Sequence, residues 1–154
     1  MRQGGPVRSD PLYVDAWGRL LRLHAEVVAR IEADLHQHGL ISLTWYDVLL
    51  ALENAPRHRL RLSEVAEKIV LSRSALTRSA ARLIEEGYLR REPCAEDERG
   101  AYAILTKKGQ EALARARPVY WAAIRKYFAA ALSDDETRTL EGILGRIVAH
   151  LPAR

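Results

Sequence analysis

The sequence has 154 residues, a formal net charge of +4 and a single cysteine. Its 48% hydrophobic and 29% charged residues are ordinary for a globular protein and argue against long disordered segments. One cysteine excludes an intrachain disulfide framework. No apolar run approaches the roughly 20 residues of a membrane-spanning helix, and the N-terminus lacks a signal-peptide hydrophobic region, so we expect a cytoplasmic protein without a membrane partner. The positive charge and a pI near 9.5 favour a polyanionic partner.

The N-terminal part of the chain predicts a flexible arm followed by a long helix. Residues 1–11 contain Gly and Pro with few apolar side chains, which is typical of a mobile segment. Apolar residues keep helical spacing over residues 12–38, and Gly39 provides a helix end. The apolar face of this helix is wider than one neighbouring surface would cover, so we expect it to contact a second chain.

The next segment predicts a short helix and then a basic loop. Thr44 and Asp47 have the spacing of a helix-capping box, which predicts a helix that starts at Thr44 and cannot continue past Pro56. Residues 57–61 contain three arginines and a histidine. They are equally compatible with a phosphate contact and with a solvated loop.

Two further helices in close succession predict a helix-turn-helix. The first is expected over residues 62–69 with Ser63 as its N-cap, and the second over Ser72 to Gly87, where Ser72 is the N-cap and Gly87 the end. In the second helix one stripe is apolar, and it comprises Leu76, Ala80, Leu83 and Ile84. The opposite face carries hydroxyl and guanidinium groups.

A β-hairpin and two helices complete the predicted chain. Residues 89–92 and 102–105 favour two strands, and the charged residues 93–100 between them predict a long tip. Beyond the hairpin, Thr106 is expected to cap a helix that keeps its apolar period to Leu132 and that Pro118 should bend. A capping box formed by Ser133 and Glu136 predicts a last helix. The fold class is therefore mainly α with a small β-hairpin wing, which is a winged helix-turn-helix flanked by long helices from both termini.

In this order of elements the chain resembles the MarR family of transcriptional regulators from Trp17 to Leu151. The specific matches are LSEVAEKIVLSRSALTRSAARLIEEGYLRRE and AEDERGAYAILTKKG, and the second contains the Asp97-x-Arg99-Gly100 pattern of the family's wing. The sequence departs from the family at Val70, where Gly is frequent, and at Ser79, where apolar residues are frequent. The resemblance implies one domain over residues 1–154, with dimerisation helices at 12–38 and 107–151 and the DNA-binding winged helix-turn-helix at 44–105. It implies a homodimeric repressor without a cofactor.

Residue types within the predicted helix-turn-helix favour a duplex DNA partner. From Ser72 to Arg91 five arginines stand against two glutamates, on a helix of the size that the major groove admits. The alternative is a solvated charged face. By resemblance, Arg99 enters the minor groove and Asp97 orients it. A homodimer would read a pseudo-palindromic operator with half-sites about one helical turn apart. The predicted DNA-contacting residues are Arg73, Ser74, Thr77, Arg78, Arg82, Asp97 and Arg99.

The resemblance also implies a small effector, often aromatic and anionic, bound between the dimerisation helices and the winged helix. The candidate pocket residues are Trp17, His24, Trp45 and Tyr46, for which core and interface packing is the plainer explanation.

Other functions have weaker signals. Cys94 in the wing is a candidate redox sensor, although we expect an exposed bystander, and His36 and His38 with Glu32 have metal-ligand types at what is otherwise a polar helix end. We therefore expect no metal site. A winged helix can also be a protein-interaction module that binds no DNA. An enzyme is least expected, since the sequence has no Gly-rich phosphate loop, nucleophile elbow or metal-ligand motif of convincing spacing.

Overall fold

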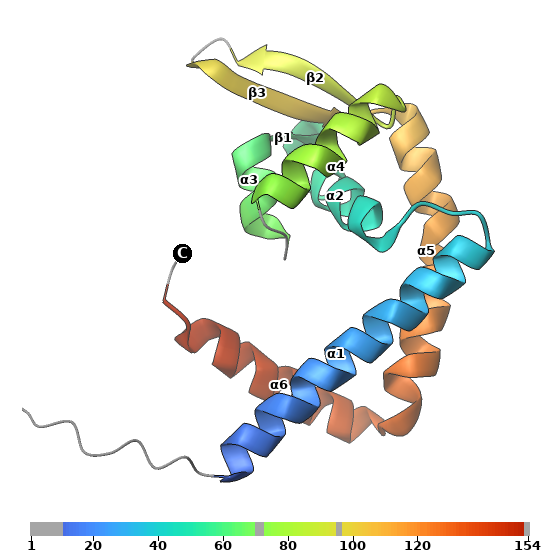
Figure 1. Ribbon diagram of the computed structural model, residues 1–154, viewed down its shortest axis with the longest axis vertical. Helices are drawn as coiled ribbons and strands as arrows, with labels where there is room; N and C mark the ends of the chain where they lie inside the picture. The colour runs from blue at the N-terminus through green and yellow to red at the C-terminus, as the bar shows by residue number, and fades with distance from the viewer. Residues whose placement is uncertain (1–10, 70–72, 95–96, 153–154) are drawn as a thin grey trace, which may run out of the picture.

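The computed structural model describes residues 11–69, 73–94 and 97–152, without the side chains of residues 66–67, 73–75 and 97–100. The molecule has a compact end, where short helices pack on a small sheet, and an open end of three long helices (Figure 1). The helices are α1 (Pro11–Gln37), α2 (Leu43–Glu53), α3 (Leu62–Lys68), α4 (Arg73–Glu85), α5 (Lys107–Tyr127) and α6 (Asp134–His150). The strands are β1 (Arg59–Arg61), β2 (Leu89–Cys94) and β3 (Asp97–Leu105), and 3-10 turns span Pro56–His58 and Ala129–Ala131. The predicted fold class, mainly α with a winged helix-turn-helix, is confirmed.

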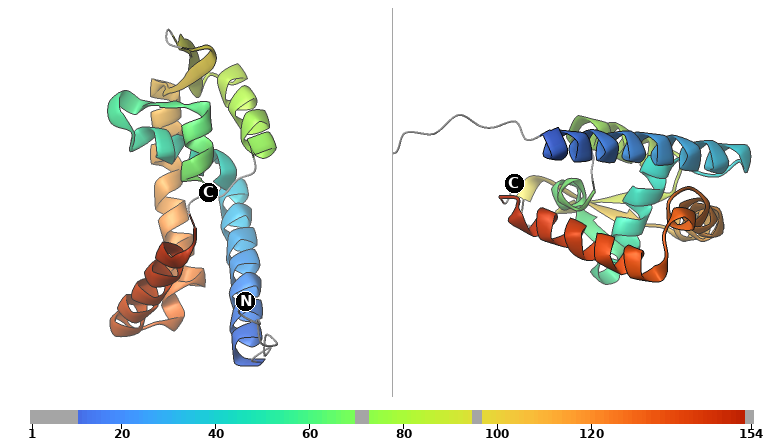
Figure 2. Two further views of the ribbon diagram at one scale, coloured as in Figure 1. Left: turned by 90° about the vertical axis from the view of Figure 1, so that its left-hand side faces the viewer. Right: turned by 90° about the horizontal axis from the view of Figure 1, so that it is seen from below.

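The three long helices form the open end. Helices α1 and α5 pack against each other, and α5 continues upward to the sheet, so that it belongs to both ends of the molecule (Figures 1 and 2). Helix α5 runs through Pro118 without interruption and ends at Tyr127, five residues before the expected apolar period ends at Leu132. Within the described ranges, no helix combines the length and hydropathy needed to cross a bilayer.

Several helix ends follow the predicted signals. At Gly39 (φ +63°) the N–H groups of Gly39 and Leu40 donate to the carbonyls of His36 and Leu35, which is a Schellman end. The Thr106 hydroxyl accepts from the Gly109 N–H at 3.1 Å, and Ser133 forms its capping box with Glu136. These three predictions are confirmed.

Two other caps were predicted at the wrong residue. Helix α2 is capped by Ser42 and not by Thr44, because Glu32 of α1 accepts from the Leu43 N–H at 2.6 Å and so satisfies the start of an earlier first turn. Helix α3 has Arg61 and not Ser63 at its N-cap, where the Glu64 carboxylate accepts from the Arg61 N–H at 2.7 Å. In both cases a carboxylate partner determines the first turn.

The sheet has the order β1-β3-β2 with antiparallel neighbours. Strand β2 pairs with β3 from Leu89↔Leu105 to Cys94↔Asp97, so the prediction of a long tip over residues 93–100 is wrong. Strand β1 pairs with β3 only from Tyr102 to Ile104, so the charged start of β3 is paired on one side alone, where charged residues are tolerated as on an edge strand. Strand β1 was not predicted: it pairs Leu60 with Ala103 and buries Leu60 between two arginines.

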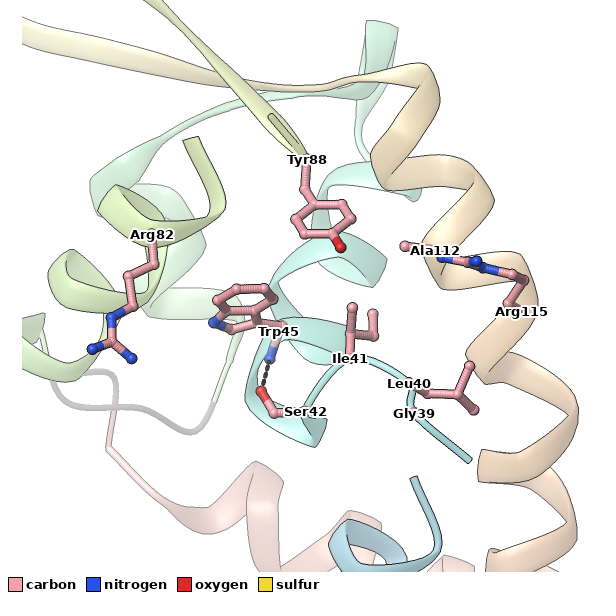
Figure 3. Close-up of a pocket in the computed structure, with 9 residues that line it drawn as sticks. All are labelled: Gly39, Leu40, Ile41, Ser42, Trp45, Arg82, Tyr88, Ala112 and Arg115. Atoms are coloured by element: carbon pink, nitrogen blue, oxygen red, sulfur yellow. Dashed lines mark hydrogen bonds between the residues drawn. The ribbon is translucent and has the colours of Figure 1, made fainter. Parts of the chain in front are cut away.

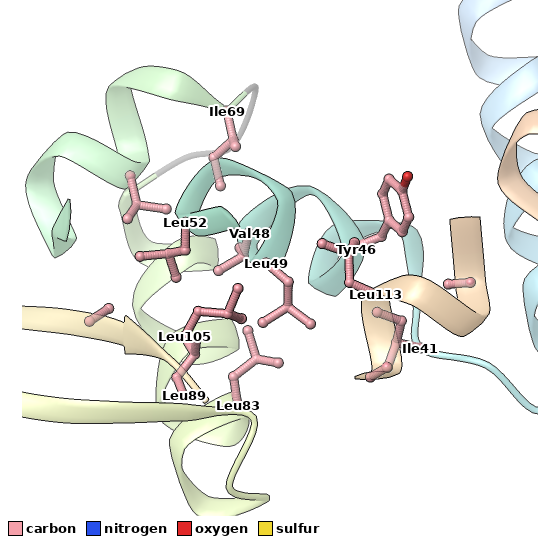
Figure 4. Packing of buried hydrophobic residues seen from close by; sticks show 14 of the residues in the cluster. Ile41, Tyr46, Val48, Leu49, Leu52, Ile69, Leu83, Leu89, Leu105 and Leu113 are labelled. Atoms are coloured by element: carbon pink, nitrogen blue, oxygen red, sulfur yellow. The ribbon is translucent and has the colours of Figure 1, made fainter. Parts of the chain in front are cut away.

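The core lies where α2 crosses the sheet, α4 and α5. Figure 4 shows Leu83 of α4, Leu89 of β2 and Leu105 of β3 lying together next to Leu49 of α2. Every buried side chain in the described part of the chain is apolar or the ring of Tyr46. At 25 cal/mol per Å², burial of a leucine side chain contributes about 2 kcal/mol, so this cluster fixes the position of α4.

Candidate nucleic-acid interface

Helix α4 presents a polar face opposite a buried apolar stripe. Leu76, Ala80 and Leu83 are 3%, 1% and 0% exposed, and Ile84 is partly buried, as the apolar pattern predicts. Thr77, Arg78 and Arg82 are exposed on the other side of the helix. Within the described part of the chain, neither the Arg78 nor the Arg82 guanidinium has a hydrogen bond or ion pair. Both cations are therefore available to a ligand outside the molecule.

The C-terminal end of α4 is anchored to α5. Gly87 (φ +77°) and Tyr88 donate backbone N–H bonds to Ile84 and Leu83 at 2.9 and 2.8 Å, which is a second Schellman end. The Tyr88 carbonyl then accepts from the Thr106 N–H at 3.1 Å. A Cβ on Gly109 would lie 2.3 Å from that carbonyl oxygen, so only glycine permits α5 to approach this closely. The contact holds the end of α4 on the first turn of α5.

The remaining predicted DNA contacts fall in parts of the chain where side chains are not described. Arg73 and Ser74 lie in the first turn of α4, and Asp97 and Arg99 lie at the start of β3. Ser72, the expected N-cap, and Val70, where the sequence departs from the family, lie outside the described residues. The backbone thus places these residues on α4 and the wing without placing their side chains.

The basic segment before α3 is only partly free. Arg59 on β1 lies 3.8 Å above the Tyr102 ring, and its guanidinium is 3.5 Å from the Glu92 carboxylate, which also pairs with Arg90 at 3.2 Å. Arg57 has a φ of 57° in the preceding turn. The sequence left residues 57–61 as either a phosphate contact or a solvated loop. The structure shows neither for Arg59, which is part of the sheet surface. The period-two pattern of a three-residue strand is too short to detect in the sequence.

A cavity of about 360 Å³ lies beside the C-terminal half of α4 (Figure 3). Its aromatic wall is formed by Trp45 and Tyr88, whose rings meet edge to face at 5.6 Å. Arg82 of α4 and Arg115 of α5 line opposite sides of it in the view of Figure 3. Neither Tyr88 nor Arg115 was a predicted site residue. The sequence signal was weak, since Arg115 lies among the charged residues of a long helix.

A larger cavity of about 780 Å³ is lined by residues of α1, α2 and α5 and by the end of α3. Glu32 and Asp47 both line it. Burial, with a smaller contribution from the Glu32 charge, raises the pKa of the Asp47 carboxyl to about 6. The cavity thus has an acidic side between the open end and the winged helix.

The four residues predicted for an effector pocket are not brought together. Trp17 is 58% exposed on α1, His24 lines the larger cavity, and Trp45 lines the smaller one. Tyr46 is buried in the core, where its ring packs 4.5 Å from that of Tyr120 and Arg117 hydrogen-bonds to it. Arg117 also pairs with Glu53, which ties α2 to α5.

The residues considered for redox or metal chemistry have structural surroundings. Cys94 is 5% exposed, so the expectation of an exposed cysteine is wrong: it is the last residue of β2 and pairs with Asp97 of β3 instead of lying in an open tip. His38 Nδ1 is 2.7 Å from the Asp34 carbonyl, and the Glu32 carboxylate accepts from the Leu43 N–H. Among the described residues, no three His, Cys, Asp or Glu side chains are grouped so that they could hold a metal ion.

The chain is similar to known transcriptional regulators over most of its length. A model of the MarR family matches residues 38–100. The HTH-type transcriptional regulator PrsX of Escherichia coli is 33% identical over an alignment of 149 residues, and the alignment covers 92% of this chain and 87% of PrsX. The transcriptional repressor MprA of Escherichia coli (strain K12) is 30% identical over 111 residues, 72% of this chain and 62% of MprA.

A solved structure shares both the fold and the sequence pattern. Sco3205, a MarR family transcriptional regulator from Streptomyces coelicolor solved in complex with DNA, superposes with a TM-score of 0.84 at 31% identity. The match covers 96% of this chain and 91% of Sco3205.

Proposed function

Since the chain belongs to the MarR family of transcriptional regulators, we propose that it binds a pseudo-palindromic operator as a homodimer and represses transcription until an effector releases it. The observation that carries this proposal is the exposed face of α4, where Arg78 and Arg82 have no ion-pair partner among the described residues and lie opposite a buried apolar stripe. DNA as partner implies action in the cytoplasm and a binding role, not an enzymatic one.

The proposed dimer rests on apolar surface that one chain leaves exposed. Trp17 on α1 is 58% exposed, and Val148 and Leu151 at the end of α6 are 67% and 63% exposed. Phe128, Leu140, Leu144 and Val148 line a groove of about 610 Å³ on α6. An apolar surface of this extent is typical of an interface. We assign α1, α5 and α6 to the dimerisation part and residues 44–105 to the DNA-binding part of one domain.

The proposed DNA contacts divide between two grooves. Arg78, on the exposed face of α4, reads base edges in the major groove with Thr77, while Arg82 and the first-turn residues Arg73 and Ser74 contact phosphate or bases. By family resemblance Arg99 at the wing enters the minor groove and Asp97 orients it. The two modes can be told apart by measuring affinity. Loss of a base contact weakens binding to the cognate site alone, whereas loss of a phosphate contact weakens binding to every duplex.

The test compares cognate and scrambled duplexes at several salt concentrations. Arg78→Ala should cost about 1–3 kcal/mol on the cognate site and much less on the scrambled one. Arg99→Ala should weaken both duplexes and reduce the salt slope. Arg138→Ala is the matched control, since Arg138 is an exposed arginine on α6 that pairs only with Asp135 in the described part. Equal loss on both duplexes for Arg78→Ala would refute the base-reading assignment.

The same experiment distinguishes the alternative role. A winged-helix module that binds only proteins would show no salt-dependent affinity for any duplex. None of these variants would then differ from the wild type in the DNA-binding assay. For the effector, the larger cavity between α1 and the winged helix supports the proposal, because its walls come from both the dimerisation and DNA-binding parts. A ligand there changes affinity for DNA only if it favours one arrangement of those parts.

A further inference from the structure

We infer that the larger cavity, next to α1, selects an organic cation such as a protonated amine and disfavours anions. Its role as an effector site rests on the proposed function, whereas its charge preference rests on the residues that line it. The inference departs from the family resemblance, which implies an anionic effector. The preference can therefore be tested both without DNA and against ligands of the opposite charge.

Two carboxylates line the cavity from different helices, Glu32 from α1 and Asp47 from α2. The Glu32 carboxylate already accepts from the Leu43 N–H at 2.6 Å. Asp47 is half-buried, and among the described residues it has neither a hydrogen-bond donor nor an ion-pair partner. A carboxylate removed from water without a partner is unfavourable when it is charged. A ligand that brings a positive charge and N–H donors would supply what Asp47 lacks.

The protein places little positive charge next to these carboxylates. Lys68, at the end of α3, is exposed and forms no ion pair with Glu32 or Asp47 in the described part of the chain. Burial, with a smaller contribution from the Glu32 charge, raises the pKa of Asp47 to about 6. A cationic side chain close to Asp47 would have lowered this pKa. The negative charge is therefore left for a ligand to neutralise, and an anion would be repelled.

The rest of the lining suits the apolar part of such a ligand. Tyr120 contributes an aromatic side chain, and cations are attracted to the faces of aromatic rings. A volume of about 780 Å³ lies within the range of small-molecule sites, about 300–1,000 Å³, so it admits a ligand of two or three rings. The apolar lining residues are Val28, Ile31, Leu43, Leu50, Ala51 and Ile69.

The test compares three ligands with one ring system: 2-naphthylmethylammonium, 2-naphthylmethanol and 2-naphthoate. Calorimetry on the full chain at neutral pH should show that the ammonium binds on the order of tenfold more tightly than the alcohol, because only the ammonium makes charged hydrogen bonds. The naphthoate should bind more weakly than the alcohol. Asp47→Asn should weaken ammonium binding by a similar factor and leave the alcohol unchanged. Asp134→Asn, exposed at the start of α6, is the matched control and should change neither.

The same pair of charges predicts a pH dependence of binding. The other titratable groups that line the cavity are His24 and Glu32 on α1, Lys68 on α3 and Tyr120 on α5. Below neutral pH the amine of the probe keeps its proton, whereas Asp47, with a pKa of about 6, gains one. Affinity for the ammonium should therefore fall about tenfold between pH 7 and pH 5. Histidine also titrates in this range, so the pH dependence must disappear in Asp47→Asn, which retains His24.

Three results would overturn the charge preference. The first is an ammonium that fails to bind or binds no more tightly than the alcohol or the naphthoate. The second is unchanged ammonium binding by Asp47→Asn, which would place the cation elsewhere. The third is a pH dependence that persists in Asp47→Asn, which would assign it to another group.

DNA titrations test the effector role separately. The ammonium should change the affinity of the wild type for its operator duplex, and this change should be absent in Asp47→Asn. Ammonium binding that left DNA affinity unchanged would refute the effector role of the cavity. If the wild type bound no duplex, the proposed function would fail, while calorimetry would still decide whether the cavity selects a cation.

Discussion

Replacement of Gly109 by alanine tests how the position of α4 is fixed. The new Cβ would lie 2.3 Å from the Tyr88 carbonyl oxygen and 2.6 Å from Leu105 Cδ1. The leucine can move, but the carbonyl is backbone and accepts from the Thr106 N–H. Overpacking costs about 1–3 kcal/mol, and a weakened hydrogen bond adds about 0.5–1.5 kcal/mol. Alanine regains about 1 kcal/mol of helix propensity, so we expect a net destabilisation of about 1–3 kcal/mol.

The assay is urea unfolding at one fixed protein concentration, with Gly142→Ala as control. Gly142 lies within α6, where the nearest atom to a new Cβ is Arg146 Nη1 at 3.9 Å, so the same substitution should stabilise by up to about 1 kcal/mol. Opposite signs for two Gly→Ala changes in helices would establish the close approach as the cause. If Gly109→Ala were as stable as the wild type, α5 would not be pressed against Tyr88, and the account of how α4 is held would be wrong.

Three further predictions follow from burial and charge. Because the folded pKa of Asp47 is raised to about 6, the folded state binds its proton more tightly, and stability falls as pH rises from about 4 to 6; Asp47→Asn should remove this part of the pH dependence in urea titrations and be the more stable chain near neutral pH. Cys94 should resist a thiol reagent until the chain unfolds, and Cys94→Ser should cost about 1–3 kcal/mol through a buried hydroxyl. Val148→Glu should produce monomer in sedimentation velocity, whereas Thr139→Glu, on the opposite face of α6, should not.

The arrangement of α4 was predictable because every local signal agreed there. The apolar stripe from Leu76 to Ile84, the stop at Gly87 and the cap at Thr106 all lie within one or two turns of the residues that they control. The strand content was predicted less well. Strand β1 is three residues long and forms only when β3 pairs with it. The charged residues of β2 and β3 adopt a strand conformation because these two strands pair with each other, not because of intrinsic strand propensity.

Tertiary partners explain what the sequence did not predict. The start of α2 depends on Glu32, eleven residues before the N–H that it accepts from, and no local pattern contains that information. The smaller cavity combines residues from the α1–α2 connection, α2, α4 and α5, so Arg115 acquires its place only through the packing of α5 on Tyr88. The four aromatic and histidine residues predicted for a pocket were chosen by residue type, and type alone does not determine which cavity a side chain faces.

The bond from Glu32 to the Leu43 N–H has a mechanical consequence. Between α1 and α2 the backbone turns at Gly39, and this connection would act as a free hinge if nothing crossed it. The Glu32 carboxylate bonds across this turn, and the Arg117–Glu53 ion pair joins the far end of α2 to α5. The winged helix should therefore move together with the long helices as one rigid body. In a dimer, a small change in the angle between the two α1 helices would then be magnified at the tips of the wings. The separation of the two α4 helices, and with it the match to the spacing of the operator half-sites, would be set at the open end of the molecule, far from any base.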